Sequence, residues 1–230
     1  MGRIHLISGA SSGIGARIAA ELQRAGDEVV PVVRRAEDAV KLGATRHLLC
    51  DFADPAQTQS AFQSFEGPVD SFINAAGMAI GKAIWDTAPG DIGVLMNVNL
   101  ISPMLACGAL RGKINAGGAI ILLSSQSAYR GGWDDAYNAS KGGINTFIKS
   151  LAMKLAPDVR VIGIAPGIVI GTRMTAGRQQ NDLDRIKETI PLKRFAEVGE
   201  VAAMVLSLLG PAGAYVTGAV IDMNGGNYLR

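Results

Sequence analysis

The sequence contains few of the residues that build metal centres or disulfide frameworks. Its 230 residues include two cysteines, Cys50 and Cys107, and two histidines, His5 and His47. Neither pair has the short spacing that zinc ligands require, so no metal site is expected. Two widely separated cysteines are typical of reduced thiols in a cytosolic protein rather than of a disulfide scaffold.

The sequence also lacks an excess of charge and long apolar runs. Acidic and basic residues are interspersed and leave a formal net charge of +2, so a nucleic-acid surface, which needs a basic patch, is not expected. No apolar run approaches the length of a membrane span, and MGRIHLIS leads directly into a strand-like segment without a signal peptide. We therefore expect a cytoplasmic protein with no membrane partner.

Short apolar segments alternate with helical patterns along most of the chain. The strand candidates are 3–8, 28–33, 46–50, 69–74, 119–124, 159–165 and 219–223. Helical patterns lie between them, for example at 13–26 and 199–210. Apolar strands that alternate with helices predict an α/β fold, a doubly wound parallel sheet with helices on both faces. No linker or repeat divides the chain, so we predict a single domain over residues 1–230.

Two prolines interrupt this pattern. Pro31 lies inside the second strand candidate, where it removes a hydrogen-bond donor from the sheet. Pro103 lies inside the helix predicted over 91–111 and should kink it.

A glycine-rich turn follows the first strand candidate. The stretch SGASSGIG (8–15) places glycines at 9, 13 and 15, and an amphipathic helix begins at once. Such glycines let a backbone approach a diphosphate, and the helix N-terminus offers free N–H groups to it. We predict a nucleotide-binding turn; a tight packing turn is the alternative.

A tyrosine and a lysine occupy the core-facing stripe of a later helix. In DDAYNASKGG (134–143), Tyr137 and Lys141 begin a stripe that continues through Ile144 and Ile148. A lysine is rarely buried without a partner, so we expect Lys141 to point into a ligand cleft. Because the two residues are neighbours on the helix, the ammonium is expected to lower the pKa of Tyr137 and make it an acid–base group.

Together these segments resemble the short-chain dehydrogenase/reductase family. The resemblance covers SGASSGIG, NAAG (74–77), MNVNL (96–100), ILLSSQSA, YNASK, APG (165–167) and VTGAVIDMNGG (216–226). It implies a Rossmann-type sheet of about seven strands and hydride transfer between a nicotinamide cofactor and a carbonyl or secondary alcohol substrate. The catalytic residues that it implies are Asn99, Ser125, Tyr137 and Lys141. Tyr137 would exchange the proton, Ser125 would hold the substrate oxygen, Lys141 would bond the ribose, and Asn99 would anchor a water.

The family resemblance and the glycine pattern together define a candidate cofactor site. Its residues are Gly9, Ser11, Ser12, Gly13, Ile14, Gly15, Arg34, Arg35, Asp51, Phe52, Asn74, Ala75, Ala76, Gly77, Tyr137, Lys141, Pro166, Gly167, Val169 and Thr172. The candidate substrate residues are Ser125, Gln126 and Tyr137.

Two spacings depart from the family pattern. Ser125 lies 12 residues before Tyr137, where the family usually shows 13, so Ser124 remains an alternative that matches by count. We favour Ser125 because the surrounding strand end aligns best. Thr172 lies one residue further from Pro166 than the family's usual threonine.

The end of the second strand candidate predicts the cofactor. Where NAD-binding folds carry an acid for the ribose 2′-hydroxyl, this chain has Arg34 and Arg35, and a guanidinium can hold a 2′-phosphate. We predict NADP(H) over NAD(H), with NAD(H) possible and Arg34 as the main determinant. Two solvated arginines are the plain alternative. Ser12 stands where NADP-using relatives often have a basic residue.

The leading functional prediction is a carbonyl reductase or alcohol dehydrogenase acting on a small molecule. A 3-oxoacyl-[acyl-carrier-protein] reductase is the alternative within the class, and a non-catalytic nucleotide-binding sensor is the alternative outside it. Enoyl reductases of the family space their tyrosine and lysine more widely, so that reaction is disfavoured. Asp134 and Asp135 near the cleft suggest a cationic or polyol substrate. The resemblance also implies a homo-oligomer, either a tetramer or a dimer.

Overall fold

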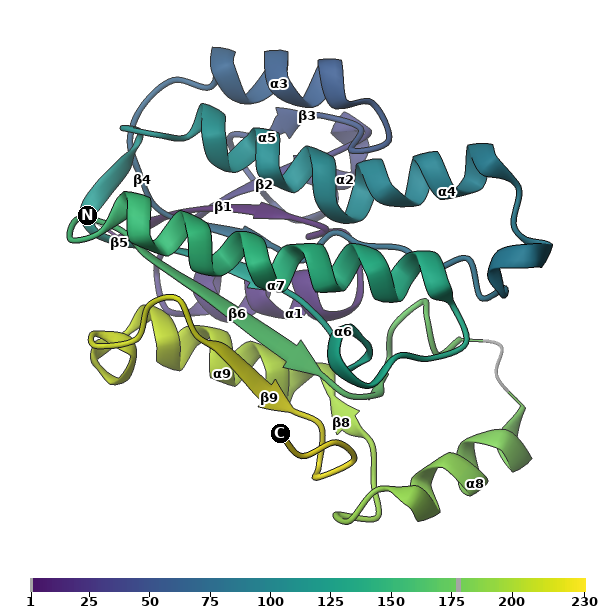
Figure 1. Cartoon of the computed structure of the whole chain (residues 1–230). Helices are drawn as coiled ribbons and strands as arrows, with labels where there is room; N and C mark the ends of the chain where they lie inside the picture. Colours follow the sequence, from purple (N-terminus) through teal and green to yellow (C-terminus); the bar gives the residue numbers. More distant parts are fainter. Residues whose placement is uncertain (1, 177–178) are drawn as a thin grey trace.

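The computed structural model describes residues 2–176 and 179–230, and its central feature is a seven-stranded sheet (Figure 1). The strand order is β3-β2-β1-β4-β5-β6-β9, and every neighbouring pair is parallel. The strands are β1 (Ile4–Ser8), β2 (Glu28–Val33), β3 (Leu48–Leu49), β4 (Val69–Asn74), β5 (Ile114–Leu123), β6 (Arg160–Pro166) and β9 (Val220–Met223). A separate parallel pair joins β7 (Val169–Ile170) to β8 (Ala196–Glu197). The predicted fold class is confirmed.

Helices cover both faces of the sheet, as Figure 1 shows. They are α1 (Gly13–Arg24), α2 (Ala36–Lys41), α3 (Pro55–Ser64), α4 (Pro89–Met96), α5 (Ser102–Ala109), α6 (Ser127–Arg130), α7 (Asp135–Leu155), α8 (Gln180–Thr189) and α9 (Val198–Leu209), with short 3₁₀ turns η1 (Ile84–Asp86) and η3 (Pro211–Gly213). Helices α3, α5 and α7 pack on one face, and α1 and α9 pack on the other. Strand order reverses between β1 and β4, where α/β sheets of this kind bind ligands.

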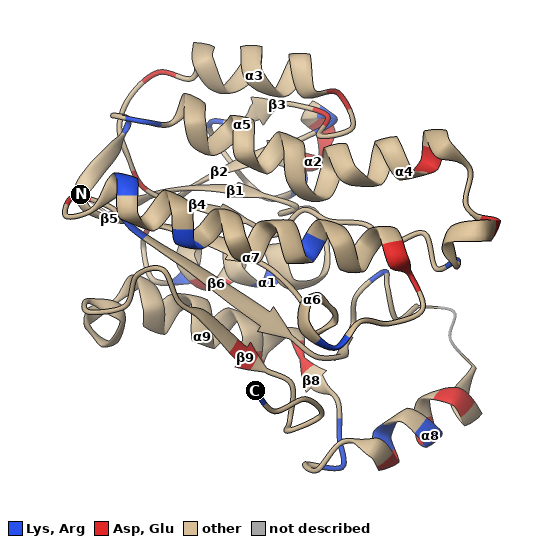
Figure 2. Cartoon of the chain, in the orientation of Figure 1, with Lys and Arg blue, Asp and Glu red and all other residues tan. Residues whose placement is uncertain are grey.

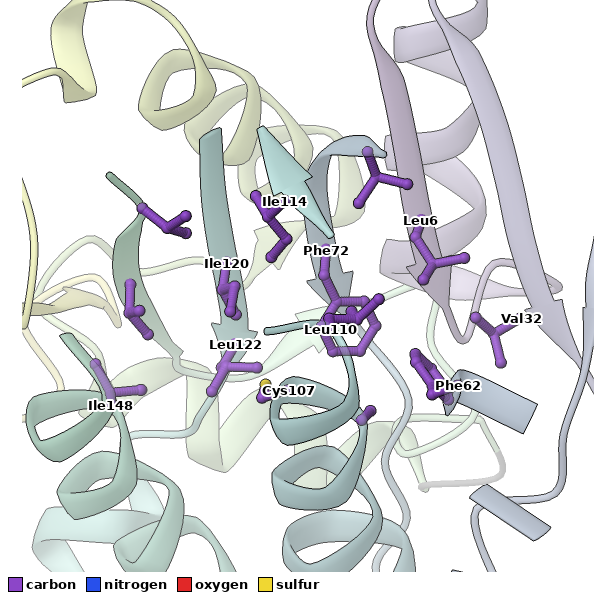
Figure 3. Packing of buried hydrophobic residues seen from close by; sticks show 14 of the residues in the cluster. Leu6, Val32, Phe62, Phe72, Cys107, Leu110, Ile114, Ile120, Leu122 and Ile148 are labelled. Carbon is purple, nitrogen blue, oxygen red and sulfur yellow. The ribbon is translucent and has the colours of Figure 1, made fainter. Parts of the chain in front are cut away.

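The buried strands are largely apolar because each of them contributes side chains to two cores. In β1, Leu6 packs with the α3–α5–α7 layer while the adjacent Ile7 packs with the α1–α9 layer. Figure 3 shows the first core, where the Phe62 and Phe72 rings meet edge to face with centroids 5.5 Å apart. Cys107 is buried beside them, and neither it nor Cys50 forms a disulfide.

The predicted kink at Pro103 takes the form of a π-helical turn. Helices α4 and α5 are joined by η2 (Asn97–Ile101), a π-helix that ends just before Ser102 and Pro103. Proline has no N–H for the carbonyl one turn earlier, so the helix widens there instead of continuing its α-helical ladder. The wider turn carries Asn99, whose side chain bonds Met78 after β4 and Ser140 of α7.

The run Pro89–Ala109 also corrects an expectation from the sequence. This 21-residue run contains an 18-residue window with a mean hydropathy of 1.6, so it is long and apolar enough by length and composition to cross a membrane. We expected no such run. In the fold α5 packs on α3 and α4 packs on α7, so the run forms part of the helical layer over the sheet.

Pro31 is accommodated because it lies outside the hydrogen-bonded part of the β2–β3 pair. Glu28 N donates to Arg3 O, so alternate N–H positions from residue 28 face β1 and the position of Pro31 faces the opposite side. On that side β3 pairs only with Val32 and Val33. The missing donor of Pro31 therefore leaves no sheet carbonyl without its partner.

Candidate active site

The first turn of α7 sets the position of the tyrosine and the lysine. Asp134 is the N-cap, and its Oδ1 accepts a hydrogen bond from Tyr137 N at 3.0 Å. Ile144 and Ile148, farther along the stripe, are fully buried and hold the helix against β6. Because Tyr137 and Lys141 lie on the same face, both point toward the C-terminal end of the sheet.

Lys141 is buried to 3% exposure, and its Nζ donates to Leu123 O at the end of β5, 2.8 Å away. Burial lowers the pKa of Lys141 from 10.5 to about 8. The ammonium lies 5.7 Å from the centre of the Tyr137 ring. This geometry holds Lys141 beside Tyr137. That Lys141 points into a ligand cleft stays a prediction.

The predicted electrostatic effect on Tyr137 was wrong for the protein without ligand. Burial raises the pKa of Tyr137, the nearby Asp134 carboxylate adds to the rise, and only the Ser125 hydroxyl acts in the opposite direction. Burial disfavours the phenolate more than the Ser125 hydrogen bond favours it. Tyr137 is therefore a protonated phenol at neutral pH.

The two candidate serines have different partners. Ser124 Oγ donates to Asn145 Oδ1 of α7 at 2.5 Å, so its hydroxyl is committed to packing β5 against the helix. Ser125 Oγ accepts from Ser127 N at 3.1 Å and remains the hydroxyl that acts on Tyr137. This geometry places Ser125, the favoured candidate, beside the tyrosine.

Asn99 is completely buried and holds the segment that follows β4. Its Oδ1 accepts from Met78 N at 2.9 Å, and its Nδ2 donates to Met78 O at 2.8 Å and to Ser140 Oγ at 3.1 Å. A Cβ on Gly77 would lie 3.5 Å from both Asn99 Oδ1 and Lys141 Nζ, so Gly77 separates the two side chains. The amide acts on the backbone here, and it makes no direct contact with Lys141.

The glycine turn combines packing and binding roles. A Cβ on Gly9 would lie 2.7 Å from the Ala75 carbonyl carbon, and one on Gly15 would lie 2.3 Å from Gly9 O, so these two glycines permit backbone contact within the protein. Gly13 has no such contact; it begins α1 with a φ of +56°. The packing alternative therefore applies to two of the three glycines.

The residues around this turn fit a dinucleotide. The side chain of Ser12, the N-cap of α1, makes no capping hydrogen bond, so the N–H groups of the first turn remain for an anion. Asn74 is tied to the turn through Ser8 Oγ, which donates to its Oδ1 at 2.6 Å. Its Nδ2 is buried without a hydrogen-bond partner among residues 2–176 and 179–230. A buried orphan donor beside a free helix N-terminus is the pattern expected of a ligand site.

The two arginines after β2 are not equivalent. Arg35 is held by Asp38, with its Nε 3.3 Å from Oδ2 and its Nη2 3.2 Å from Oδ1. Arg34 is exposed, and no side-chain hydrogen bond or ion pair involves it within the described part of the chain. Figure 2 shows basic and acidic residues close together at the start of α2. Arg34 is therefore the guanidinium that is free for a phosphate.

The structure brings most of the remaining predicted residues to the same edge, with two exceptions among the side chains. Pro166 ends β6 and Gly167 follows it, while Thr172 places its methyl group 3.6 Å from where a Cβ of Gly13 would be. Phe52 and Val169, however, belong to the two cores, so only their backbone can reach a cofactor.

The remaining predicted residues occupy two segments of the same region. Asp51 accepts from Ala53 N at 3.0 Å, which shapes the turn after β3. Around the glycine turn and after β4 lie Ser11, Ile14, Ala75 and Ala76. Ala76 N donates to Ser8 Oγ at 3.3 Å, so the two segments are tied together. Gln126 follows Ser125, and its buried Oε1 has no hydrogen-bond partner within the described residues.

The sequence reasoning missed the role of the two acids before Tyr137. Asp134 and Asp135 accept hydrogen bonds from backbone N–H groups. The buried Asp134 is therefore not free to attract a cationic or polyol substrate as suggested. An aspartate three residues before the first residue of an apolar stripe is a helix N-cap signal that could have revealed the first of them. The partners of Ser140 and Asn145 had no comparable signal.

Comparisons with known proteins agree with this geometry. Residues 9–227 match the family model described as enoyl-(acyl carrier protein) reductase. The 3-oxoacyl-[acyl-carrier-protein] reductase of Mus musculus is 35% identical over 241 residues, covering 100% of this chain and 99% of that protein. Carbonyl reductase family member 4 of Danio rerio is 34% identical, with 100% and 99% coverage.

Solved structures give the same result. A short-chain dehydrogenase/reductase (glucose/ribitol dehydrogenase) from Brucella melitensis superimposes with a TM-score of 0.91 at 28% identity, covering 99% of this chain and 97% of that one. A blue fluorescent protein from a metagenomic library, in complex with NADPH, has a TM-score of 0.90 at 29% identity, with 99% and 98% coverage. The chain therefore belongs to the short-chain dehydrogenase/reductase family. It is an oxidoreductase that uses a nicotinamide cofactor and acts on small molecules.

Proposed function

We propose that the chain is an NADPH-dependent reductase of carbonyl groups in which Tyr137 donates the proton. The observation that carries the proposal is the position of Ser125, Tyr137 and Lys141 at the sheet end where the glycine turn and Asn74 offer unpaired donors. The alternative of a non-catalytic sensor is disfavoured because a binding protein needs no protonated phenol beside a serine hydroxyl.

The residues divide the chemistry among them. When bound, the cofactor supplies the hydride that the substrate carbon receives. Ser125 orients the carbonyl oxygen toward Tyr137, whose raised pKa keeps its proton available at neutral pH. As the proton passes to that oxygen, the O–H bond of Tyr137 breaks and its phenolate forms beside the Lys141 ammonium. That positive charge lowers the energy of the phenolate when it appears.

Arg34 supports NADPH as the cofactor. It is exposed and unpaired within the described residues, whereas the otherwise similar Arg35 is held by Asp38. We expect Arg34→Ala to lower kcat/KM for NADPH by about tenfold or more, because a charge-assisted phosphate contact is lost, and to leave NADH unaffected. Arg35→Ala is the matched control and should change little. A wild type that prefers NADH would overturn the cofactor proposal.

For the substrate we favour 3-oxoacyl thioesters within the carbonyl class. The support is the naming of the relatives, since the mouse protein is a 3-oxoacyl-[acyl-carrier-protein] reductase and a 31% identical relative from Acinetobacter is an acetoacetyl-CoA reductase. The test follows NADPH oxidation with acetoacetyl-CoA, a small ketone and a ketose in parallel. Turnover that is fastest with the thioester is expected. A preference for the ketose would contradict the thioester as substrate, while the proposal of a carbonyl reductase would stand.

The exposed side of the α4–α5 run supports a proposal of self-association. Three apolar side chains of this run are each about 40% exposed: Val94, Ile101 and Met104. A solvent-facing surface is rarely as apolar as the run Pro89–Ala109. We propose a homodimer or homotetramer that buries this side. Light scattering coupled to size exclusion should give a multiple of 23.9 kDa, and Val94→Lys should lower that mass. A cytoplasmic location remains a prediction.

A further inference from the structure

The segment between β4 and η1 is held in place by side chains rather than by backbone partners. Residues 78–84, here called the wall segment, connect the end of β4 to the first 3₁₀ turn. Within the described structure, the N–H groups of Met78, Ile80 and Gly81 donate to no backbone carbonyl. Met78 is held by Asn99, as described above, and the others have partners at the start of α7.

Asp134 supplies the central attachment. Its Oδ2 accepts from Ile80 N at 2.6 Å and from Gly81 N at 2.7 Å, while its Oδ1 accepts from Tyr137 N at 3.0 Å. The side chain is buried to 8% exposure, so these charge-assisted bonds form away from water. One carboxylate thus joins the wall segment to the helical turn that bears the proton donor.

Asp135 also connects the wall segment to the start of α7, but through a single hydrogen bond. Its Oδ2 accepts from Ile84 N at 2.9 Å at the end of the wall segment, but the residue is exposed. Figure 1 shows the connection from β4 to α4 passing the N-terminal end of α7, and Figure 2 shows acidic residues there. The two acids differ in burial and in number of bonds, so they form a natural pair for comparison.

We propose that Asp134 is a positioning residue for the reaction: it fixes the wall segment against the turn that carries Tyr137, so that the substrate carbonyl is confined within reach of the phenol. The proposal rests on the proposed function of Tyr137 as proton donor. A helix N-cap requires only one acceptor, and serine supplies it. The two further bonds to Ile80 and Gly81 exceed what capping requires.

Substitution by serine separates the two roles. In Asp134→Ser the hydroxyl can still accept from Tyr137 N, but it is too short to reach Ile80 and Gly81. Hydrogen exchange of the two amides, followed in the protein without ligand, should accelerate by about tenfold or more because hydrogen bonds to a charged group are lost. The melting temperature should fall less than in Asp134→Ala, because the serine retains the cap.

Kinetics with acetoacetyl-CoA and NADPH provide the second readout. We expect kcat/KM of Asp134→Ser to fall by about 100-fold, as is typical when a reacting group is misplaced by an ångström, with NADPH affinity unchanged. Asp135→Ala, which loses one exposed bond, should cost about fivefold or less.

The outcomes separate this proposal from the proposed function. Unchanged exchange at Ile80 and Gly81 in Asp134→Ser would show that the carboxylate does not hold the wall segment. Faster exchange with wild-type kinetics would show that the attachment does not matter for the reaction, and wild-type activity in Asp134→Ser combined with low activity in Asp134→Ala would reduce Asp134 to a cap. All three results overturn the proposal. If the wild type reduced no carbonyl compound, the proposed function would fail while the exchange result still decided the attachment.

Discussion

Polar side chains are buried at both the N-terminal and the C-terminal end of the sheet. The two ends differ in whether these side chains have hydrogen-bond partners. At the N-terminal end, His5 lies between two partners, with Nδ1 2.7 Å from Ser71 Oγ and Nε2 3.1 Å from Asp27 Oδ2. At the C-terminal end, hydrogen-bond partners are missing within the described residues for Asn74 Nδ2, Gln126 Oε1, Asn145 Nδ2 and Tyr129 Oη. At the N-terminal end, the buried atom without a hydrogen-bond partner within the described residues is Glu28 Oε1, and the charged Arg46 Nη1 lies 3.5 Å from it.

This difference distinguishes a structural cluster from a binding site. A buried polar group without a partner costs free energy, so a protein tolerates several of them together only where a ligand completes them. His5, Ser71 and Asp27 have the residue types of a hydrolase triad, but they satisfy one another and Ser71 is fully buried. The C-terminal end carries the unpaired atoms together with a desolvated lysine. The chemistry is therefore expected there.

The largest test removes the proton donor from the C-terminal end. Tyr137→Phe is expected to lower kcat by about 1,000-fold, because general acid catalysis is lost while the ring and its packing remain. NADPH affinity, measured by calorimetry, should stay at the wild-type level. Substantial turnover by the phenylalanine variant with the preferred carbonyl substrate would show that another group donates the proton.

A second test distinguishes two adjacent serines, one satisfied and one facing the site. Ser125→Ala should lower kcat/KM by about 100-fold and leave stability nearly unchanged. Ser124→Ala should do the reverse and cost about 1–2 kcal/mol of unfolding free energy, because Asn145 loses its buried partner. Urea unfolding and steady-state kinetics on both variants decide it. The opposite pattern would move the assignment to Ser124.

The smallest test concerns His5 at the N-terminal end. Burial lowers the pKa of His5 below its usual 6.5, despite the opposing effect of its hydrogen bond to Asp27. The unfolded chain therefore binds the proton more readily, so this contribution to stability is present above pH 6.5 and is lost as the pH falls through the folded pKa. His5→Gln should reduce the stability difference between pH 7.5 and pH 5.5 and leave turnover unchanged. Equal pH dependence in wild type and variant would contradict this.

The sequence predicts this fold well because each strand repeats one local pattern. β2 and β4 match their expected bounds, and most other strands differ by a residue or two, since buried parallel strands are rich in apolar residues along their length. β5 begins five residues earlier than predicted, at Ile114. Its first half contains Asn115, Gly117 and Gly118 and therefore lacks the apolar pattern from which a strand is predicted. Helix α8 and the β7–β8 pair were not predicted, and α8 has no buried residue that would mark a core-facing stripe.

The site was predicted less completely than the fold, for a physical reason. Tyr137 and Lys141 could be found because a lysine on an apolar stripe conflicts with its surroundings. The attachments made by Asn99 and Asp134 depend on which backbone N–H groups lie opposite them, and that requires the packed structure. The pKa direction of Tyr137 was mistaken for the same reason, since helix spacing reveals the ammonium and not the depth of burial.

Lys141 tests the contrast between the two ends most directly. Its folded pKa of about 8 lies below the usual 10.5 because its charge is desolvated, so at pH 7 the folded protein without ligand bears the cost of burying an ammonium. As the pH rises from about 8 to 10.5, the unfolded chain retains the proton that the folded chain has released. The wild type then gains stability that a neutral side chain at this position would not show.

The decisive measurement is the free energy of unfolding of Lys141→Met in urea at pH 7, without cofactor, together with its turnover. The account predicts a variant that is more stable than the wild type by on the order of 2 kcal/mol and inactive, with the gain shrinking toward pH 10. A variant that is less stable than the wild type would contradict it, because Lys141 would then be part of the fold, as His5 is, rather than a charge kept buried for the reaction.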